Sequence, residues 1–140
     1  MSPMRVSSRK LAKALVSRLN DVVPTRFRLT TDGDVLHVYI GDVLNSILSL
    51  DIVMDESRDL NERLRTSVWS VINSLQSDIS EDLRTPWPSA DGRTMAMPEV
   101  ESDGERVHLW FGDSQAPVLS LPAIRIEEII DTEGENSSAT

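Results

Sequence analysis

Two short stretches of the chain repeat the residue types that could do chemistry. His37 is followed five positions later by Asp42, and 71 positions further on His108 is followed in the same way by Asp113. Two imidazoles and two carboxylates are a donor set that can hold a divalent metal ion. If the two copies met across a pseudo-two-fold axis, these four residues would form the best candidate site in the sequence.

The spacing within each copy argues against that site. The histidine and the aspartate lie on a strand and on the turn after it, which puts them roughly 16 Å apart if the chain is extended. Nothing in the sequence requires the two copies to meet. We interpret the histidines as residues of structural strands and the Gly-Asp pairs as turn residues. Neither a metal nor a cofactor is predicted, although a small-ligand or metal-binding domain that uses His37 and His108 is the alternative function.

The repeat extends beyond these pairs. Residues 32–50 align without gaps with residues 103–121, and 8 of the 19 positions are identical. In each copy an Asp-Gly turn precedes a strand whose alternate side chains are apolar, so that the polar and aromatic ones face the other way. The apolar faces are Leu36, Val38, Ile40 and Val107, Leu109, Phe111; the opposite faces are His37, Tyr39 and His108, Trp110. This pattern predicts a duplicated strand-turn-strand unit.

Two helices are predicted to pack on the apolar faces. One spans residues 7–22, with leucines at 11, 15 and 19 on one stripe; the other spans residues 57–80, with Leu64, Val68 and Leu75 on a stripe of about six turns. We also expect a strand from about Ser46 to Val53 and a last helical turn at residues 124–130. The predicted fold class is α+β, with an antiparallel sheet built from the two duplicated units and packed on two main helices.

Length and charge limit the function classes. The 140 residues suit one domain at residues 7–130, with residues 1–6 as a disordered lead-in and 131–140 as a disordered acidic tail. Residues 1–28 carry a net charge of +6 and the rest of the chain −15, so the acidic body disfavours nucleic acid. There is no cysteine, and no apolar run reaches the roughly 20 residues that span a bilayer, which predicts a cytoplasmic protein without membrane insertion.

Signatures of common enzymes are missing from the sequence. It contains no glycine-rich phosphate loop, no Gly-x-Ser-x-Gly elbow and no pair of histidines on a helix. No catalytic residue is predicted, and an enzyme of unfamiliar type stays open. Two tryptophans suggest contacts instead: Trp69 lies outside the apolar stripe of its helix, and Trp87, in a Pro-Trp-Pro segment, is expected to anchor the long loop at residues 81–97.

The order helix, three strands, long helix, further strands and short helix, in an acidic chain of this length, resembles the class I type III secretion chaperones and the related YbjN-like domains. The resemblance rests on element order, size and acidity, and it transfers no functional residue. It implies a bacterial, chaperone-like protein that dimerises and binds extended segments of partner proteins. We therefore predict a non-enzymatic protein-interaction module, chaperone-like or adaptor-like, that forms a homodimer. The predicted binding surface comprises His37, Tyr39, His108, Trp110, Trp69 and Trp87.

Overall fold

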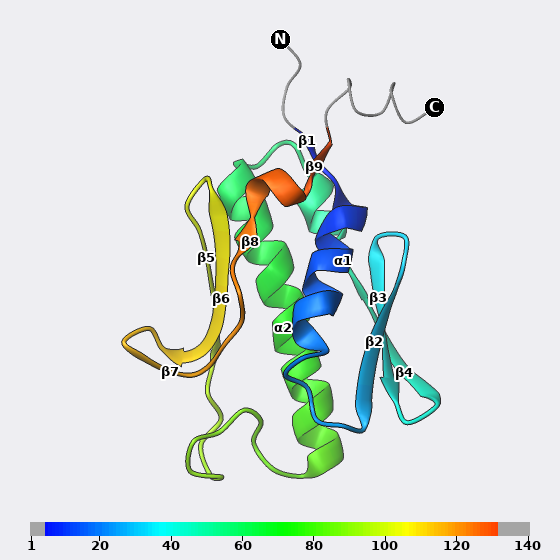
Figure 1. Ribbon diagram of the computed structural model, residues 1–140, viewed down its shortest axis with the longest axis vertical. Helices are drawn as coiled ribbons and strands as arrows, with labels where there is room; N and C mark the ends of the chain where they lie inside the picture. Colours follow the sequence, from blue (N-terminus) through cyan, green and yellow to red (C-terminus); the bar gives the residue numbers. More distant parts are fainter. Residues whose placement is uncertain (1–4, 132–140) are drawn as a thin grey trace.

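Two helices lie between two antiparallel sheets in the computed structural model (Figure 1). It describes residues 5–131, except that for residues 51 and 52 it describes the backbone alone. Short 3-10 helices follow β4 and β8. The elements in chain order are β1 (Arg5–Val6), α1 (Ser8–Leu19), β2 (Phe27–Asp32), β3 (Val35–Ile40), β4 (Val43–Ser49), η1 (Asp51–Met54), α2 (Leu60–Leu83), β5 (Pro98–Ser102), β6 (Arg106–Asp113), β7 (Ala116–Ser120), β8 (Ile124–Arg125), η2 (Ile126–Glu128) and β9 (Ile130–Asp131).

The long helix α2 forms where its apolar stripe predicts, three residues later than expected at each end. Its cap is Asp59, whose side chain accepts hydrogen bonds from the backbone N–H groups of Asn61 at 3.1 Å and Glu62 at 3.4 Å. The helix ends at Leu83 and is capped by Arg84, which adopts the left-handed conformation with φ of +57°. The predicted burial of Leu64, Val68 and Leu75 is confirmed, since all three are fully buried.

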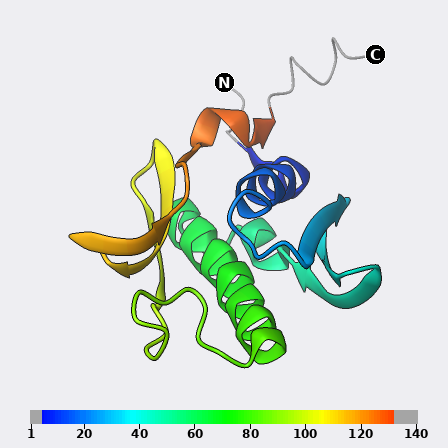
Figure 2. The same ribbon diagram turned by 60° about the horizontal axis from the view of Figure 1, so that its bottom comes forward.

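The α+β class and the packing of the strand units on two helices are confirmed, but the units form two sheets instead of one. One sheet has the order β2-β3-β4; the other has the order β5-β6-β7, with β8 also paired to β6. The sheets lie on opposite sides of the helix pair in both views (Figures 1 and 2). The two helices bury apolar side chains toward both sides, so each unit can cover its own side of the pair.

The first two strands of the units are equivalent residue by residue. Leu29 pairs with Val38 in one sheet, and Val100 pairs with Leu109, each 71 positions later, in the other. The third strands differ, because β3 turns back after Ile40 whereas β6 continues to Asp113. Strand β4 consequently begins three residues earlier than expected, and it ends at Ser49, where the 3-10 helix replaces the predicted end of the strand.

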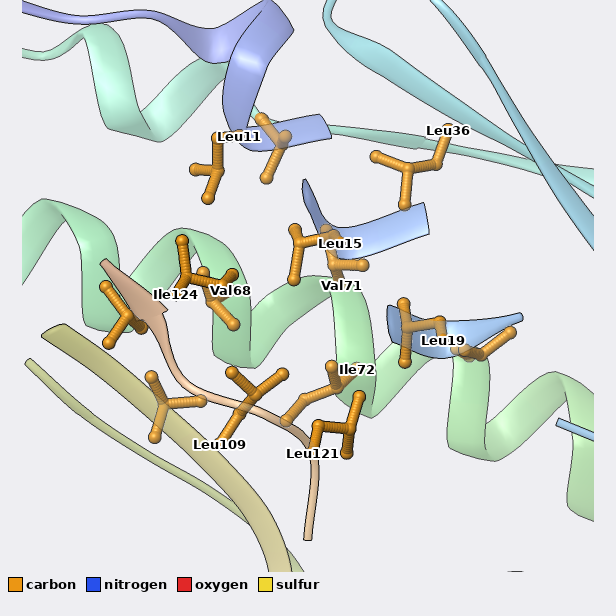
Figure 3. Packing of buried hydrophobic residues seen from close by; sticks show 14 of the residues in the cluster. Leu11, Leu15, Leu19, Leu36, Val68, Val71, Ile72, Leu109, Leu121 and Ile124 are labelled. Atoms are coloured by element: carbon orange, nitrogen blue, oxygen red, sulfur yellow. The ribbon is translucent and has the colours of Figure 1, made fainter. Parts of the chain in front are cut away.

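One hydrophobic cluster joins both sheets to both helices (Figure 3). Leu36 of β3 reaches it from one side and Leu109 of β6 from the other, with Leu15 of α1 and Val71 of α2 between them. The predicted inner faces of both strand units are therefore buried, apart from Ile40, which is partly buried. It follows that the opposite face of each sheet points away from the helices.

The two ends of the described chain pair with each other. Arg5 and Val6 form β1, which runs antiparallel to Ile130 and Asp131 of β9, and Val6 is buried in the core. The expected lead-in at residues 1–6 is therefore too long by these two residues, and the expected tail at 131–140 begins one residue too early. Pairs this short leave no periodic pattern to read. The predicted helix at 124–130 is only the 3-10 turn η2 between two short strands, and the other end residues lie outside the described part.

Candidate functional site

Each repeated histidine lies beside the aspartate that precedes its own turn. His108 Nε2 is 3.2 Å from Asp103 Oδ2, and His37 Nε2 is 4.0 Å from Asp32 Oδ2. Asp103 also accepts hydrogen bonds from the backbone N–H groups of Arg106 at 2.8 Å and Glu105 at 2.9 Å. These bonds, the one from Arg106 first, lower the pKa of Asp103 from 3.8 to about 2. The aspartate thus holds its hairpin turn and the histidine together.

The structure does not bring the two copies together. His37 and His108 lie on different sheets, with the helices between them (Figure 2). Asp113 accepts a hydrogen bond from the backbone N–H of Gln115 at 2.9 Å, as a turn residue does. Among the side chains that the structure describes, no three histidines, aspartates or glutamates gather as metal ligands would. A site shared between the copies, as considered from the sequence, is not formed.

The aromatic residues of the two outer faces have different surroundings. The guanidinium of Arg28 lies over the ring of Tyr39, with its Cζ atom 4.7 Å from the ring centre. Trp110 donates its indole N–H to the carbonyl of Gly112 at 3.1 Å, which fixes the ring along its own strand. The surface predicted to include both residues is therefore divided between two faces that point in opposite directions.

The two remaining tryptophans fasten the second sheet to α2. Trp69 is 40% exposed and donates its indole N–H to the carbonyl of Pro98 in β5 at 3.1 Å. Trp87 packs edge-on against the ring of Phe111, with 5.6 Å between the ring centres, and its backbone N–H donates to the hydroxyl of Ser80 at 3.0 Å. Trp87 thus anchors the long loop, on the inner side of the second sheet.

One edge of the first sheet is closed by a side chain. The amide of Asn20, directly after α1, donates to the carbonyl of Leu29 and accepts from its N–H, both at 2.9 Å. A single asparagine therefore satisfies the backbone of β2 at this residue as a neighbouring strand would. The sequence contains no periodic signal for this contact, because Asn20 lies in a connecting segment.

The other edge of the first sheet, β4, is open. In the part of the chain that the structure describes, the backbone of residues 43–48 hydrogen-bonds only within the ladder with β3. Val43 is 69% exposed, Leu44 44% and Ile47 56%. The run Val-Leu-Asn-Ser-Ile-Leu-Ser carries neither a charge nor a proline, the residues with which proteins usually protect an edge. This uncharged composition is visible in the sequence and could have indicated an open edge.

The edges of the second sheet are better protected. Beside β5, the side chain of Gln76 donates to the carbonyl of Ala96, and Trp69 donates to that of Pro98. Strand β7 contains Pro117, and Arg18 of α1 binds the carbonyl of Pro122 just after the strand at 2.7 Å. Strand β4 is therefore the edge best suited to receive another strand.

Acidic side chains of α2 lie beside β4. Ser46 donates its hydroxyl to Asp78 at 2.6 Å, and a hollow of 330 Å³ next to Asn45 is lined by Asp78, Glu81 and Asp82 together with Arg84. Arg26 pairs with Asp82 at 3.3 Å and offsets part of this charge. The surroundings of the open edge favour a basic partner.

Neither helix of residues 5–131 is both long enough and apolar enough to cross a membrane. Searches for related proteins add no family to this description: no protein-family model, no curated protein and no solved structure matches the chain.

Proposed function

We propose that the chain is a non-enzymatic protein-interaction module that receives an extended segment of a partner protein as a new strand beside β4. The observation that carries the proposal is the open, uncharged edge at residues 43–48. An extended peptide that adds to such an edge gains backbone hydrogen bonds, and its alternate side chains supply the specificity. This function is adaptor-like or chaperone-like, as the order of elements suggests.

The surroundings of β4 define the partner segment. Leu44 and Ile47 pair with Tyr39 and His37 of β3, so their exposed side chains belong to the outer face of the sheet. Apolar residues at alternate positions of the partner strand would cover them. Basic residues on its other face would meet Asp78 and the acids after it in α2. The extra residue Asn45 forms a bulge in β4, so the segment must follow a twisted edge.

Selection of peptides of about eight residues from a random library tests this function. Selected peptides should be extended and should combine alternating apolar residues with lysine or arginine. Methylating alternate backbone nitrogens of a selected peptide should abolish binding for one set of positions and spare the other, because only one set faces β4.

Two matched variants locate the site. Ile47→Lys places a charge at the open edge and should reduce the affinity for the selected peptides at least tenfold. Val118→Lys places the same charge on β7, where the native side chain is 39% exposed, and should leave the affinity unchanged. Peptides that bind both variants equally well, or that tolerate methylation at every position, would rule out strand addition at β4.

A further inference from the structure

The duplication places a cation over the aromatic ring of one copy, whereas among the described residues no cation lies over the equivalent ring of the other copy. Arg28 pairs directly with Tyr39, and its guanidinium covers the ring with Cζ 4.7 Å from the ring centre. The residues 71 positions later are Glu99 and Trp110, and they pair directly in the same register. The second copy thus has the larger ring, and an acid where the first copy has its arginine.

The surroundings of Trp110 are acidic. Glu99 and Glu101 are exposed on the same outer face, and across the described residues neither has an ion pair or a side-chain hydrogen bond. Asp103 adds a third carboxylate, which is held by its turn and by His108. Apart from His108, which pairs with Asp103, the nearest basic side chain on this face of β6 is that of Arg106, four residues or about 13 Å along the strand from Trp110.

The outer face is hollowed beside the ring. A depression of 340 Å³ is lined by Glu101, Asp103, His108, Trp110 and Ser120, with the β6–β7 turn at one end. The hydrogen bond from the indole N–H to the carbonyl of Gly112 holds the ring in place without using its π face. The ring is therefore positioned before any ligand arrives.

We propose that this depression binds the guanidinium group of an arginine in a partner protein. The arginine would stack on Trp110 as Arg28 stacks on Tyr39. Glu101, which lines the depression, would pair with its charge, and Glu99, directly opposite Trp110 on β5, would add a second carboxylate beside the ring. A planar guanidinium suits both tasks, because it stacks on an aromatic face and pairs with carboxylates, and tryptophan binds cations more strongly than tyrosine does. The site is separate from the β4 edge and lies on the other sheet.

Titration of the full chain with N-acetyl-arginine amide tests the site. The indole N–H resonance of Trp110 should shift at millimolar concentrations at constant ionic strength, and the shift should follow a saturable curve. N-acetyl-citrulline amide has the same shape without the charge and should cause no saturable shift. N-acetyl-lysine amide should bind more weakly, by roughly two- to fivefold, because its ammonium does not stack.

Exchanging the residue types at positions 28 and 99, which lie opposite the two aromatic rings, gives matched variants. Glu99→Arg recreates the first copy's arrangement within the chain and should abolish the response of Trp110 to the arginine compound. Arg28→Glu bares the ring of Tyr39 and should make the Tyr39 ring resonances respond to the same compound. Both residues are exposed, so thermal melting should show that both variants are folded. A Trp110 response that persists in Glu99→Arg, that is absent from the native chain, or that is equal for arginine and lysine would overturn the assignment.

Discussion

Replacing Asn20 with alanine removes both hydrogen bonds that close the β2 edge. The two bonds, each 2.9 Å long, satisfy the N–H and the carbonyl of Leu29, whose own side chain is buried. A bond of this kind contributes about 0.5–1.5 kcal/mol, so Asn20→Ala should lower the free energy of unfolding by about 1–3 kcal/mol. Urea denaturation should show the loss as a midpoint lower by roughly 1 M with an unchanged slope.

Two further variants separate this effect from others. Asn45→Ala removes an asparagine from the exposed edge β4, where its side chain has no hydrogen bond among the described residues, and should change stability by less than about 0.5 kcal/mol. Asn20→Asp keeps the acceptor but sets a carboxylate oxygen against the carbonyl of Leu29, so it should not restore stability. If Asn20→Ala matched the native chain, or if Asn20→Asp were equally stable, the idea that the side chain replaces a strand would be wrong.

Four other predictions concern the core, a bulge, an acid and the oligomeric state. Val68→Asp should give no cooperative unfolding transition by circular dichroism, because an unpaired carboxylate at this fully buried position costs several kcal/mol. Gly112→Ala should lower the free energy of unfolding, measured in urea, by roughly 1–3 kcal/mol, and by more than Gly41→Ala does. Both glycines have positive φ, but only at position 112 would the new Cβ meet a neighbour, the backbone N of Val118 at 3.2 Å. The pKa of Asp103 is lowered to about 2, so its carboxylate stabilises the fold fully above pH 3.8, and this stabilisation is lost as the pH falls toward 2. Unfolding curves should show that Asp103→Asn is less stable than the native chain near neutral pH. The difference in stability should shrink between pH 3.8 and pH 2. Light scattering at micromolar concentration should show the homodimer predicted from the sequence, and a monomer at that concentration would contradict it.

The apolar periodicity predicted the core residues of the long helix and of the central strands. In α2 the stripe through Leu64, Val68 and Leu75 is buried as expected, because a helix surrounded by other elements must bury its apolar face. In the strands, alternation separated Leu36 and Leu109 from the histidines and aromatics of the outer faces. The offset of 71 positions, found in the sequence only for residues 32–50, also relates the first two strands of the units in the structure.

The same periodicity could not show how the two units are arranged. Alternation predicts which side of a strand is buried. The alternating pattern is identical whether two units share one sheet or cover opposite sides of a helix pair. The partner of His108 was missed for a related reason: Asp103 lies before the turn, and it approaches the histidine only after the hairpin closes. The roles of Asn20 and β4 depend on which edges the tertiary structure covers, and no local pattern records that.

The pairing of β1 with β9 makes the described chain nearly circular. Arg5 and Asp131 are direct partners, and the Cα atoms of such a pair are about 4.5–5.5 Å apart, so a linker of a few residues could join them. Strands β1 and β9 lie side by side at the top of Figure 1. A permuted chain could then begin in the exposed loop around Gly92, and the order of the two strand units along the sequence would be reversed without changing their contacts.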